Sequence, residues 1–475
     1  MIHCYKSNGY NIVLDVNSGS VHIMDEISYD LVQVMESIVL DYVANERKLD
    51  ADIITEDILA QNDLKYTKDE VKETVEEVIY LYENEALYTE DIYKPLIGTI
   101  AKRETVVKAL CLHIAHDCNL ACKYCFAEEG EYHGRRAIMS YDVGKRALDF
   151  LVENSKNRIN LEVDFFGGEP LMNWSVIKDL VAYGRSLEPI YNKKFRFTLT
   201  TNGVLLNDEV IEFANKEMSN IVLSLDGRKE VNDNMRPFRN GRGSYEIIVP
   251  KYQRVADSRD QMNYYVRGTF THENLDFSKD VMHLADLGFK QISMEPVVAA
   301  PEEGYALTEE DVPVVKEEYD KLALALLERR KNGEAFNFFH FMIDLDGGPC
   351  ISKRVSGCGC AAEYMAVTPW GDYYPCHQFV GEEDMIIGNV YEGITKSDLV
   401  DEFKVCNVYT KPGCELCFAK FYCSGGCMAN GFHFADDINK NYEIGCELER
   451  KRVECAIMMK AAIADEKEIE ENEEK

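Results

Sequence analysis

The chain is poor in positive charge for its length. Its 475 residues contain 52 lysines and arginines against 84 aspartates and glutamates, which gives a net charge of -32. Binding to a nucleic-acid backbone or to an anionic membrane surface needs a basic footprint. The composition therefore argues against nucleic acid and membranes as partners and leaves a neutral or basic peptide open.

Long apolar runs and targeting signals are also missing. The sequence has no stretch of about twenty apolar residues, the length needed to cross a bilayer. Its first residues, MIHCYKSNGYNIVLDV, lack the basic and apolar regions and the cleavage site of a signal peptide. We therefore expect a cytoplasmic protein.

Cysteine, in contrast, is abundant, with 16 residues. In a reducing compartment, clustered cysteines are more often ligands of metals or clusters than disulfide partners. Three lie in CNLACKYC, residues 118–125, and most of the others lie between residues 345 and 455. The sequence therefore predicts metal or cluster binding in two separate regions.

The first ninety residues read as one small unit. HCYKSNGYNIVLDVNSGSVHIMD alternates apolar and polar residues around two turn signals, as antiparallel strands do. Three helical patterns follow, and Thr67 with Glu70 forms a capping-box signal for the last of them. We expect a winged-helix-like recognition module over 1–90, followed by a linker over 91–107.

Residues 108–310 alternate short apolar strands with helices in six successive units. This pattern predicts an α/β fold with a parallel sheet, most simply a partial (β/α)6 barrel of the TIM type. Every strand ends in polar or glycine-rich residues, where such barrels place their chemistry. A bridging helical region over 311–344, a cysteine-rich domain over 345–455 with little regular structure, and a solvated acidic tail over 456–475 complete the expected organisation.

The spacing Cys118-x3-Cys122-x2-Cys125 supplies three thiolates where a closed cluster would take four. An open position on the metal lets a ligand coordinate. A zinc site completed by a histidine, namely His113, His116 or His133, is the alternative. Because the three cysteines directly follow the first barrel strand, the segment resembles the radical S-adenosylmethionine (SAM) superfamily.

The resemblance implies roles for further residues at the strand ends. Cys118, Cys122 and Cys125 would hold a [4Fe-4S] cluster whose open iron chelates SAM. The family uses the segment that is GGEP here to bind the SAM amino group, and an arginine is the natural partner of its carboxylate. The SAM-binding residues implied in this way are Tyr124 near the adenine; Gly167, Gly168, Glu169 and Pro170 at the amino group; Thr200 and Asn202 at the next strand end; Ser224 and Asp226 at the ribose; and Arg267 at the carboxylate.

The C-terminal cysteines form a longer string, Gly371-x4-Cys376 and Cys414-x2-Cys417-x5-Cys423-x3-Cys427, with Cys446 downstream. This string resembles the SPASM domain, which implies two auxiliary [4Fe-4S] clusters and therefore three clusters in the chain; a pair of structural zinc ions is the alternative. The implied ligands are Cys414, Cys417, Cys423 and Cys446 for one cluster, and Cys376, Cys427 and Cys358 for the other.

The fourth ligand of the second auxiliary cluster stays open at this point. Cys350 and Cys360 are the candidates, with Cys350 preferred, and a substrate thiolate would serve if neither reaches. The doublet Cys358-Gly-Cys360 departs from the family pattern. Cys4, Cys111, Cys406 and Cys455 are expected to be ordinary buried thiols.

Together these parts resemble the maturases of ribosomally made peptides. The first ninety residues resemble the RiPP recognition element, which binds a leader peptide as an added strand. IVLDVNSGSVHIMDEISYDLV, GGPC…GCGC and EYMAVTPWGDYYPCHQFVGEE resemble the maturases of cysteine-rich SCIFF peptides. The resemblance implies thioether formation through a 5'-deoxyadenosyl radical, a short cysteine-rich precursor with a leader, a reductant such as ferredoxin or flavodoxin, and an anaerobic organism.

Three alternatives stay open at the level of sequence. Sulfatase maturation to formylglycine shares the barrel and the cysteine-rich domain, but it does not explain the N-terminal module. A carbon–carbon crosslinking maturase explains the module and differs in the acceptor. A non-catalytic iron–sulfur or zinc scaffold would contain metal without cleaving SAM.

Overall fold

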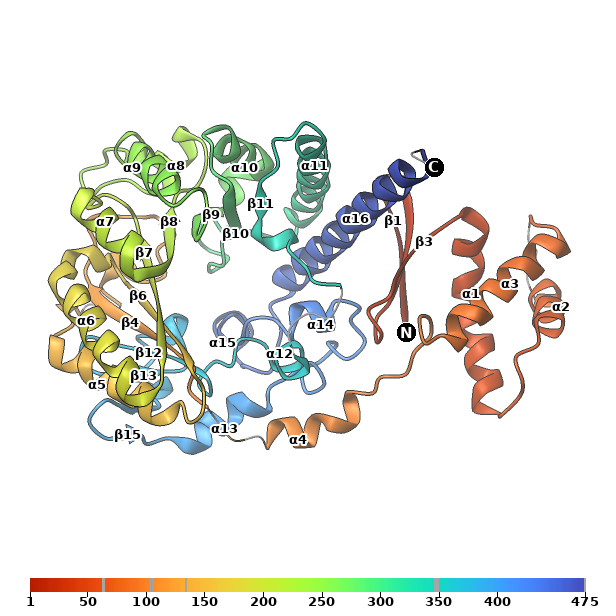
Figure 1. Cartoon of the computed structure of the whole chain (residues 1–475), viewed down its shortest axis with the longest axis horizontal. Coiled ribbons are helices and arrows are strands. Elements are labelled where there is room, and N and C mark those ends of the chain that lie inside the picture. Colours follow the sequence, from red (N-terminus) through yellow and green to blue (C-terminus); the bar gives the residue numbers. More distant parts are fainter. Residues whose placement is uncertain (62–64, 103, 105, 133–134, 346–349, 474–475) are drawn as a thin grey trace.

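The computed structural model describes the chain except for residues 62–64, 103, 105, 133–134, 346–349 and 474–475. His133 and the Gly-Gly-Pro before Cys350 lie outside the described residues. Figure 1 shows three regions in chain order: a small N-terminal module, a barrel, and a C-terminal region that ends in a long helix lying between them.

The N-terminal module is a three-stranded antiparallel sheet followed by three helices, as predicted. The strands lie in the order β1-β2-β3, so β3 is an edge strand. In the last helix, Thr67 and Glu70 form both bonds of the predicted capping box. Val13 of the sheet and Leu31, Val71 and Val75 of the helices are fully buried in one small core. The elements are β1 (Ile2–Ser7), β2 (Tyr10–Asp15), β3 (Val21–Met24), α1 (Glu26–Ala44), α2 (Ala51–Gln61) and α3 (Lys68–Glu83); in the following linker lie η1 (Lys94–Leu96) and α4 (Ile97–Ala101).

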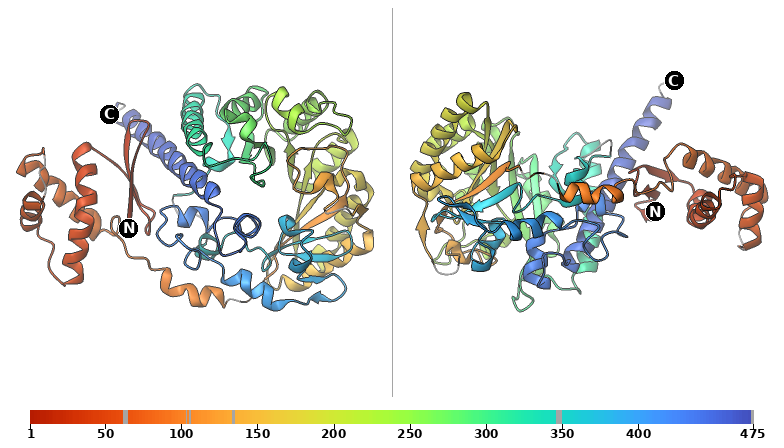
Figure 2. Two further views of the ribbon diagram at one scale, coloured as in Figure 1. Left: turned by 180° about the vertical axis from the view of Figure 1, so that it is seen from behind. Right: turned by 90° about the horizontal axis from the view of Figure 1, so that it is seen from below.

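Six parallel strands form the predicted barrel, in the order β10-β9-β8-β7-β6-β4. The barrel is open, because β10 and β4 do not pair with each other. Helices follow the strands and cover the outside of the sheet, as Figure 2 shows from two further sides. The strands are β4 (Ala109–His116), β6 (Asn160–Gly167), β7 (Lys194–Thr201), β8 (Met218–Ser224), β9 (Tyr264–Phe270) and β10 (Gln291–Pro296), and the helices are α5 (Tyr141–Asn154, with the predicted N-cap Ser140), α6 (Trp174–Tyr191), α7 (Asp208–Glu217), α8 (Lys229–Met235), α9 (Tyr245–Ser258) and α10 (Phe277–Asp286).

The C-terminal region continues the sheet of the barrel rather than forming a separate layer. Strand β12 (Tyr364–Val367) pairs in parallel with β4, and β13 (Asp372–Tyr374) pairs antiparallel with β12. At the other margin, β11 (Asn337–Phe338) pairs with β10. The remaining elements are β5 (Ala137–Ile138), beside β4; β14 (Gly388–Asn389); β15 (Gly393–Ile394); and the helices α11 (Val312–Lys331), α12 (Ile351–Ser356), α13 (Ser397–Val405), α14 (Lys420–Cys423) and α15 (Met428–Ala435).

The last helix corrects the expectation of a solvated acidic tail over 456–475. A single helix, α16, spans Glu443–Glu473. Its apolar residues Ala456, Ile457 and Met458 are fully buried, and it packs against α11 and against the sheet of the N-terminal module. The acidic residues at its end hid this helix, because the buried apolar residues lie mostly before residue 463. Among the described helices, none is long and apolar enough to cross a membrane.

Candidate functional site

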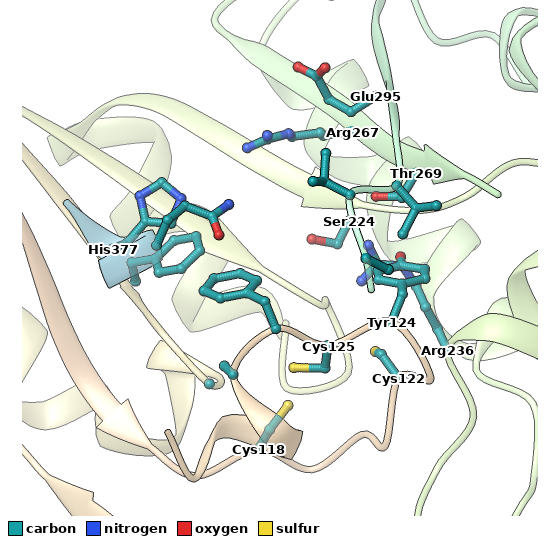
Figure 3. A pocket seen from close by; sticks show the side chains of 18 of the residues that line it. Cys118, Cys122, Tyr124, Cys125, Ser224, Arg236, Arg267, Thr269, Glu295 and His377 are labelled. Carbon is teal, nitrogen blue, oxygen red and sulfur yellow. The ribbon is translucent and has the colours of Figure 1, made fainter. Parts of the chain in front are cut away.

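The three cysteines of CNLACKYC line a cavity of about 610 Å³ at the carboxyl ends of the barrel strands (Figure 3). Strand β4 ends two residues before Cys118. The loop is then held in an extended path, because the backbone of Ala121 and Lys123 donates to the carbonyls of Pro237 and Met235 at 2.8 and 3.0 Å. The topology therefore delivers the three thiols to the predicted place.

Burial makes these thiols poor anions on their own. It raises the pKa of Cys118 and of Cys122 to about 12, and the nearby Arg236 opposes this rise at Cys122. A thiol in such a place becomes a thiolate when a metal supplies the compensating charge. Among the residues described, no three such side chains converge as closely as a single metal ion requires.

The glycines of GGEP let the end of β6 (Gly167) approach the start of the cysteine loop. A Cβ at Gly167 would lie 2.3 Å from the carbonyl oxygen of Ala115, and one at Gly168 would lie 2.1 Å from that of Asp117. Both glycines line the cavity. Their first role is therefore close packing of backbone on backbone, with the cavity wall as the result.

Glu169 does not lie where an ammonium group in the cavity would meet it. The side chain is fully buried. Its carboxylate accepts hydrogen bonds from the Thr201 hydroxyl and the backbone N–H of Asn202, both at 2.8 Å, and from the backbone N–H of Leu171 at 3.1 Å. Burial raises its pKa to about 7 despite these bonds. Glu169 thus ties the end of β6 to the end of β7, and Pro170 is buried at the start of a 3-10 turn behind the wall.

The side-chain amide of Asn202 points toward the cysteine loop. Its nitrogen donates to Asn119 Oδ1 at 2.7 Å and to Cys118 Sγ at 3.5 Å. Its oxygen accepts from the Val204 amide at 3.1 Å, which fixes the orientation of the group. Asn202 and the neighbouring Thr200 both line the cavity, as predicted.

Asp226 is also turned away from the cavity, which changes the role expected of it. Its carboxylate is fully buried, accepts the Tyr124 hydroxyl at 2.7 and 2.8 Å, and pairs with Arg236 at 3.0 Å. The Arg236 guanidinium lies over the Tyr124 ring, 5.3 Å from its centre. Asp226 therefore positions Tyr124 and Arg236, while Ser224, at the end of β8, lines the cavity itself.

The opposite wall of the cavity carries charge of both signs (Figure 3). Arg267 on β9 is exposed to the cavity. Glu295 on β10 lies 3.4 Å from His340 and 3.7 Å from Arg452. Burial alone would raise the pKa of Glu295, but His340, Arg452 and Arg267 together hold it below its usual value. The wall thus presents an anchored carboxylate beside a guanidinium.

Four C-terminal cysteines line a second, smaller cavity of about 100 Å³. Cys414, Cys417, Cys423 and Cys446 all contribute to its wall. Burial raises the pKa of Cys423 to about 12 and that of Cys446 to about 11, and the neighbouring cysteines add to the shift in both. The structure thus brings together the four residues that were predicted to share one cluster.

The other set of cysteines includes Cys360 rather than Cys350. The Cys360 thiol is hydrogen-bonded to Cys358 and Cys376, and Cys427 feels the charges of the latter two. The bond from Cys360 is the main reason that the pKa of Cys358 falls to about 6. Cys350 is exposed at the start of α12 and takes part in none of the interactions described for this set. The preference for Cys350 came from its position in the sequence, which does not show that Cys360 is buried beside Cys376.

Comparison with known proteins identifies the barrel. Residues 112–276 match the sequence model of the radical SAM superfamily. This segment is a radical SAM domain. The three-thiol loop and the ends of β6, β7, β8 and β9 all fall within it.

Relatives of known sequence extend the likeness beyond this domain. The chain is 30% identical over 190 residues to the uncharacterized protein MJ0907 of Methanocaldococcus jannaschii, covering 40% of this chain and 62% of that protein. It is 27% identical over 263 residues to the radical SAM cyclopropyl synthase TigE of Paramaledivibacter caminithermalis, covering 51% and 53%. The match to the subtilosin biosynthesis protein AlbA of Bacillus subtilis is 25% over 366 residues, covering 71% and 73%. The chain thus spans less than two thirds of the first two relatives.

Two solved structures share the fold. That of anSMEcpe with bound AdoMet and the Cp18Cys peptide superposes with a TM-score of 0.62 at 19% identity, covering 76% of this chain and 99% of that one. That of SuiB from Streptococcus suis bound to S-adenosylmethionine gives 0.52 at 14% identity, covering 94% and 98%. The likeness confirms the predicted partial barrel.

The radical SAM domain fits the cofactors that its family implies. Three thiols, an oriented amide and an exposed guanidinium face one cavity that is wide enough for a cluster together with a small molecule. Arg236, Glu295 and His377 line this cavity but were not among the site residues predicted from the sequence. Arg236 directly follows α8, and no motif in the sequence marks it. His377 reaches the cavity wall because β12 and β13 join the barrel sheet, which the sequence pattern does not show.

Proposed function

We propose that the chain is a radical SAM enzyme that installs thioether crosslinks, from a cysteine sulfur to a carbon of another residue, in a short cysteine-rich precursor peptide. One observation carries this proposal: the cavity lined by Cys118, Cys122 and Cys125 lies beside a cavity lined by cysteines of the two C-terminal sets. A cavity of about 290 Å³ lined by Cys423, Cys427 and Cys446 shares Glu295 and Asn430 with the three-thiol cavity. A peptide held there would meet both regions.

SAM and its cluster, when bound, supply a radical that removes a hydrogen atom from an unactivated carbon. Cys118, Cys122 and Cys125 would hold the cluster, and Arg267 is suited to the SAM carboxylate. Tyr124, fixed by Asp226, forms the wall where the family places the adenine. The surrounding strand ends exclude water, which protects a reactive species from quenching.

We further propose that the N-terminal module binds the leader of the precursor. Strand β3 is at the edge of its sheet, and no other strand pairs with its outer side in the described part of the chain. Ile23 on this strand is 45% exposed. An extended peptide can add to such an edge through main-chain hydrogen bonds.

Incubating the reduced, iron-loaded chain with SAM and a candidate precursor tests the proposal. We expect 5'-deoxyadenosine and a peptide that is two hydrogens lighter per crosslink, with one alkylatable thiol lost each time. A carbon–carbon crosslink, or formylglycine formed from serine, would remove two hydrogens but leave every thiol, and formylglycine formed from cysteine would remove sulfur. Cys118→Ala should abolish the product, and Cys4→Ser, outside all three cysteine sets, should leave it unchanged. A product with all its thiols intact would refute thioether formation.

A further inference from the structure

A buried lysine lies beside the four-cysteine cavity of the C-terminal region. Lys420 lines this cavity together with Cys414, Cys417 and Cys423, and only 3% of its side chain is exposed. The ammonium group lies near the rings of Phe421, at 4.9 Å, and Tyr409, at 5.5 Å. A charge this deeply buried is weakly screened by water, so a carboxylate in contact with it offsets most of its field.

The counter-charge comes from the linker that follows the N-terminal module. Asp91 Oδ2 lies 2.9 Å from Lys420 Nζ. The Tyr409 hydroxyl donates to both oxygens of the same carboxylate, at 2.8 and 2.9 Å, and the Lys420 ammonium also donates to the Glu415 carbonyl at 3.3 Å. More than three hundred positions of sequence thus separate the two members of this ion pair.

Further contacts hold the linker and the module against the same cysteine segment. The Tyr93 ring meets the edge of Phe421 at 5.4 Å, and Lys94 pairs with Glu415. From the module itself, the His3 ring stacks on Phe418 with 3.5 Å between ring centres. The place of Asp91 therefore depends on how the module and its linker sit on residues 414–423.

We propose that Asp91 is a positioning residue that neutralises Lys420 and thereby sets the reduction potential of the group held by Cys414, Cys417, Cys423 and Cys446. This inference rests on the proposed function and on the auxiliary [4Fe-4S] cluster that the SPASM resemblance implies for these four thiols. A cation beside a cluster favours its reduced form, and a paired carboxylate cancels most of that effect.

Asp91→Asn in the full, anaerobically reconstituted chain tests the inference. We expect the EPR signal that Cys414→Ala removes to titrate at a higher potential, with the ratio of reduced to oxidised cluster increased about tenfold at a fixed potential, or about 59 mV for one electron. Asp401→Asn is the matched control, because this exposed aspartate of the same region also pairs with a lysine, Lys404, at 3.0 Å. The control should leave the potential unchanged.

Three further variants separate a charge effect from loss of structure. Lys420→Gln should shift the potential in the opposite direction, the double variant Asp91→Asn/Lys420→Gln should return close to wild type, and Asp91→Glu should keep the wild-type value. A signal whose potential is the same in Asp91→Asn and wild type would overturn the inference and leave the proposed function standing. A chain with no signal that depends on Cys414 would overturn the cluster assignment itself, and the inference with it.

Discussion

Replacing Asp226 by asparagine should strongly destabilise the barrel, although Asp226 itself lies behind the cavity wall. Asp226 is fully buried and accepts bonds from the Tyr124 hydroxyl and from the Thr269 amide at 3.0 Å. It is also the carboxylate paired with Arg236, whose side chain is 11% exposed. In Asp226→Asn the guanidinium stays buried without its counter-charge.

The expected cost follows from this geometry. Removing one partner of a buried ion pair typically costs about 3 to 5 kcal/mol, because the remaining charge is uncompensated. For a barrel of roughly 200 residues this corresponds to a fall of roughly 6 to 20 °C in the midpoint of its thermal transition. Because asparagine keeps only one of the two oxygens that accept the Tyr124 hydroxyl, SAM binding should weaken together with stability.

Thermal unfolding followed by circular dichroism, with SAM affinity measured by calorimetry on the same samples, checks both expectations. Asp208→Asn is the control, because this aspartate is 74% exposed and pairs with Arg254 at the surface, where such pairs contribute less than about 1 kcal/mol. Asp226→Asn/Arg236→Met should recover most of the lost stability, since it removes the unpaired charge. A fall of less than about 2 °C in Asp226→Asn would refute the view that this pair organises the wall.

Three further predictions concern the cysteine sets, the glycine contact and the barrel interior. Cys360→Ala should lower the iron bound per chain by about one cluster while Cys350→Ala leaves it unchanged, as iron quantitation after reconstitution would show; equal losses would contradict a ligand role for Cys360 in place of Cys350. Gly168→Ala should prevent iron loading at the three-thiol loop, because its Cβ would lie 2.1 Å from the Asp117 carbonyl oxygen; a variant with the full iron content and the wild-type EPR spectrum would contradict this. Burial, together with Glu162, raises the pKa of Asp164 from 3.8 to about 6. The free energy of unfolding should therefore fall as pH rises from about 4 to about 6, and in Asp164→Asn this fall should be smaller when urea unfolding is measured across that window. A pH dependence equal to that of the wild type would contradict this.

The parts of the molecule with local, periodic signals were predictable from the sequence. The six strand-helix units, the strands and helices of the N-terminal module, and the capping box of Thr67 and Glu70 follow from patterns within a few residues. The place of the three-thiol loop followed as well, because the carboxyl ends of parallel strands meet at one edge. Each of these features depends on neighbours in sequence, which the pattern records directly.

The parts that depend on distant partners were not predictable. Glu169 and Asp226 sit in the motif positions expected of ligand-binding carboxylates, yet both bond to the chain itself, and no spacing shows which way a carboxylate turns. Arg236 became part of the wall through its pairing with Asp226. The last helix was hidden by an acidic surface that outweighs a few small buried residues in the composition.

The end of β10 links the two halves of the proposed chemistry. Glu295, Pro296, Val297 and Val298 line both the three-thiol cavity and the cavity beside Cys423, Cys427 and Cys446, so one short segment forms their common wall. His340 and Arg452 hold Glu295 from behind, and Arg452 belongs to the same helix, α16, that carries Cys446 and packs on the N-terminal module. The helix that carries Cys446 and packs on the N-terminal module therefore also fixes Glu295, the carboxylate that lines both cavities.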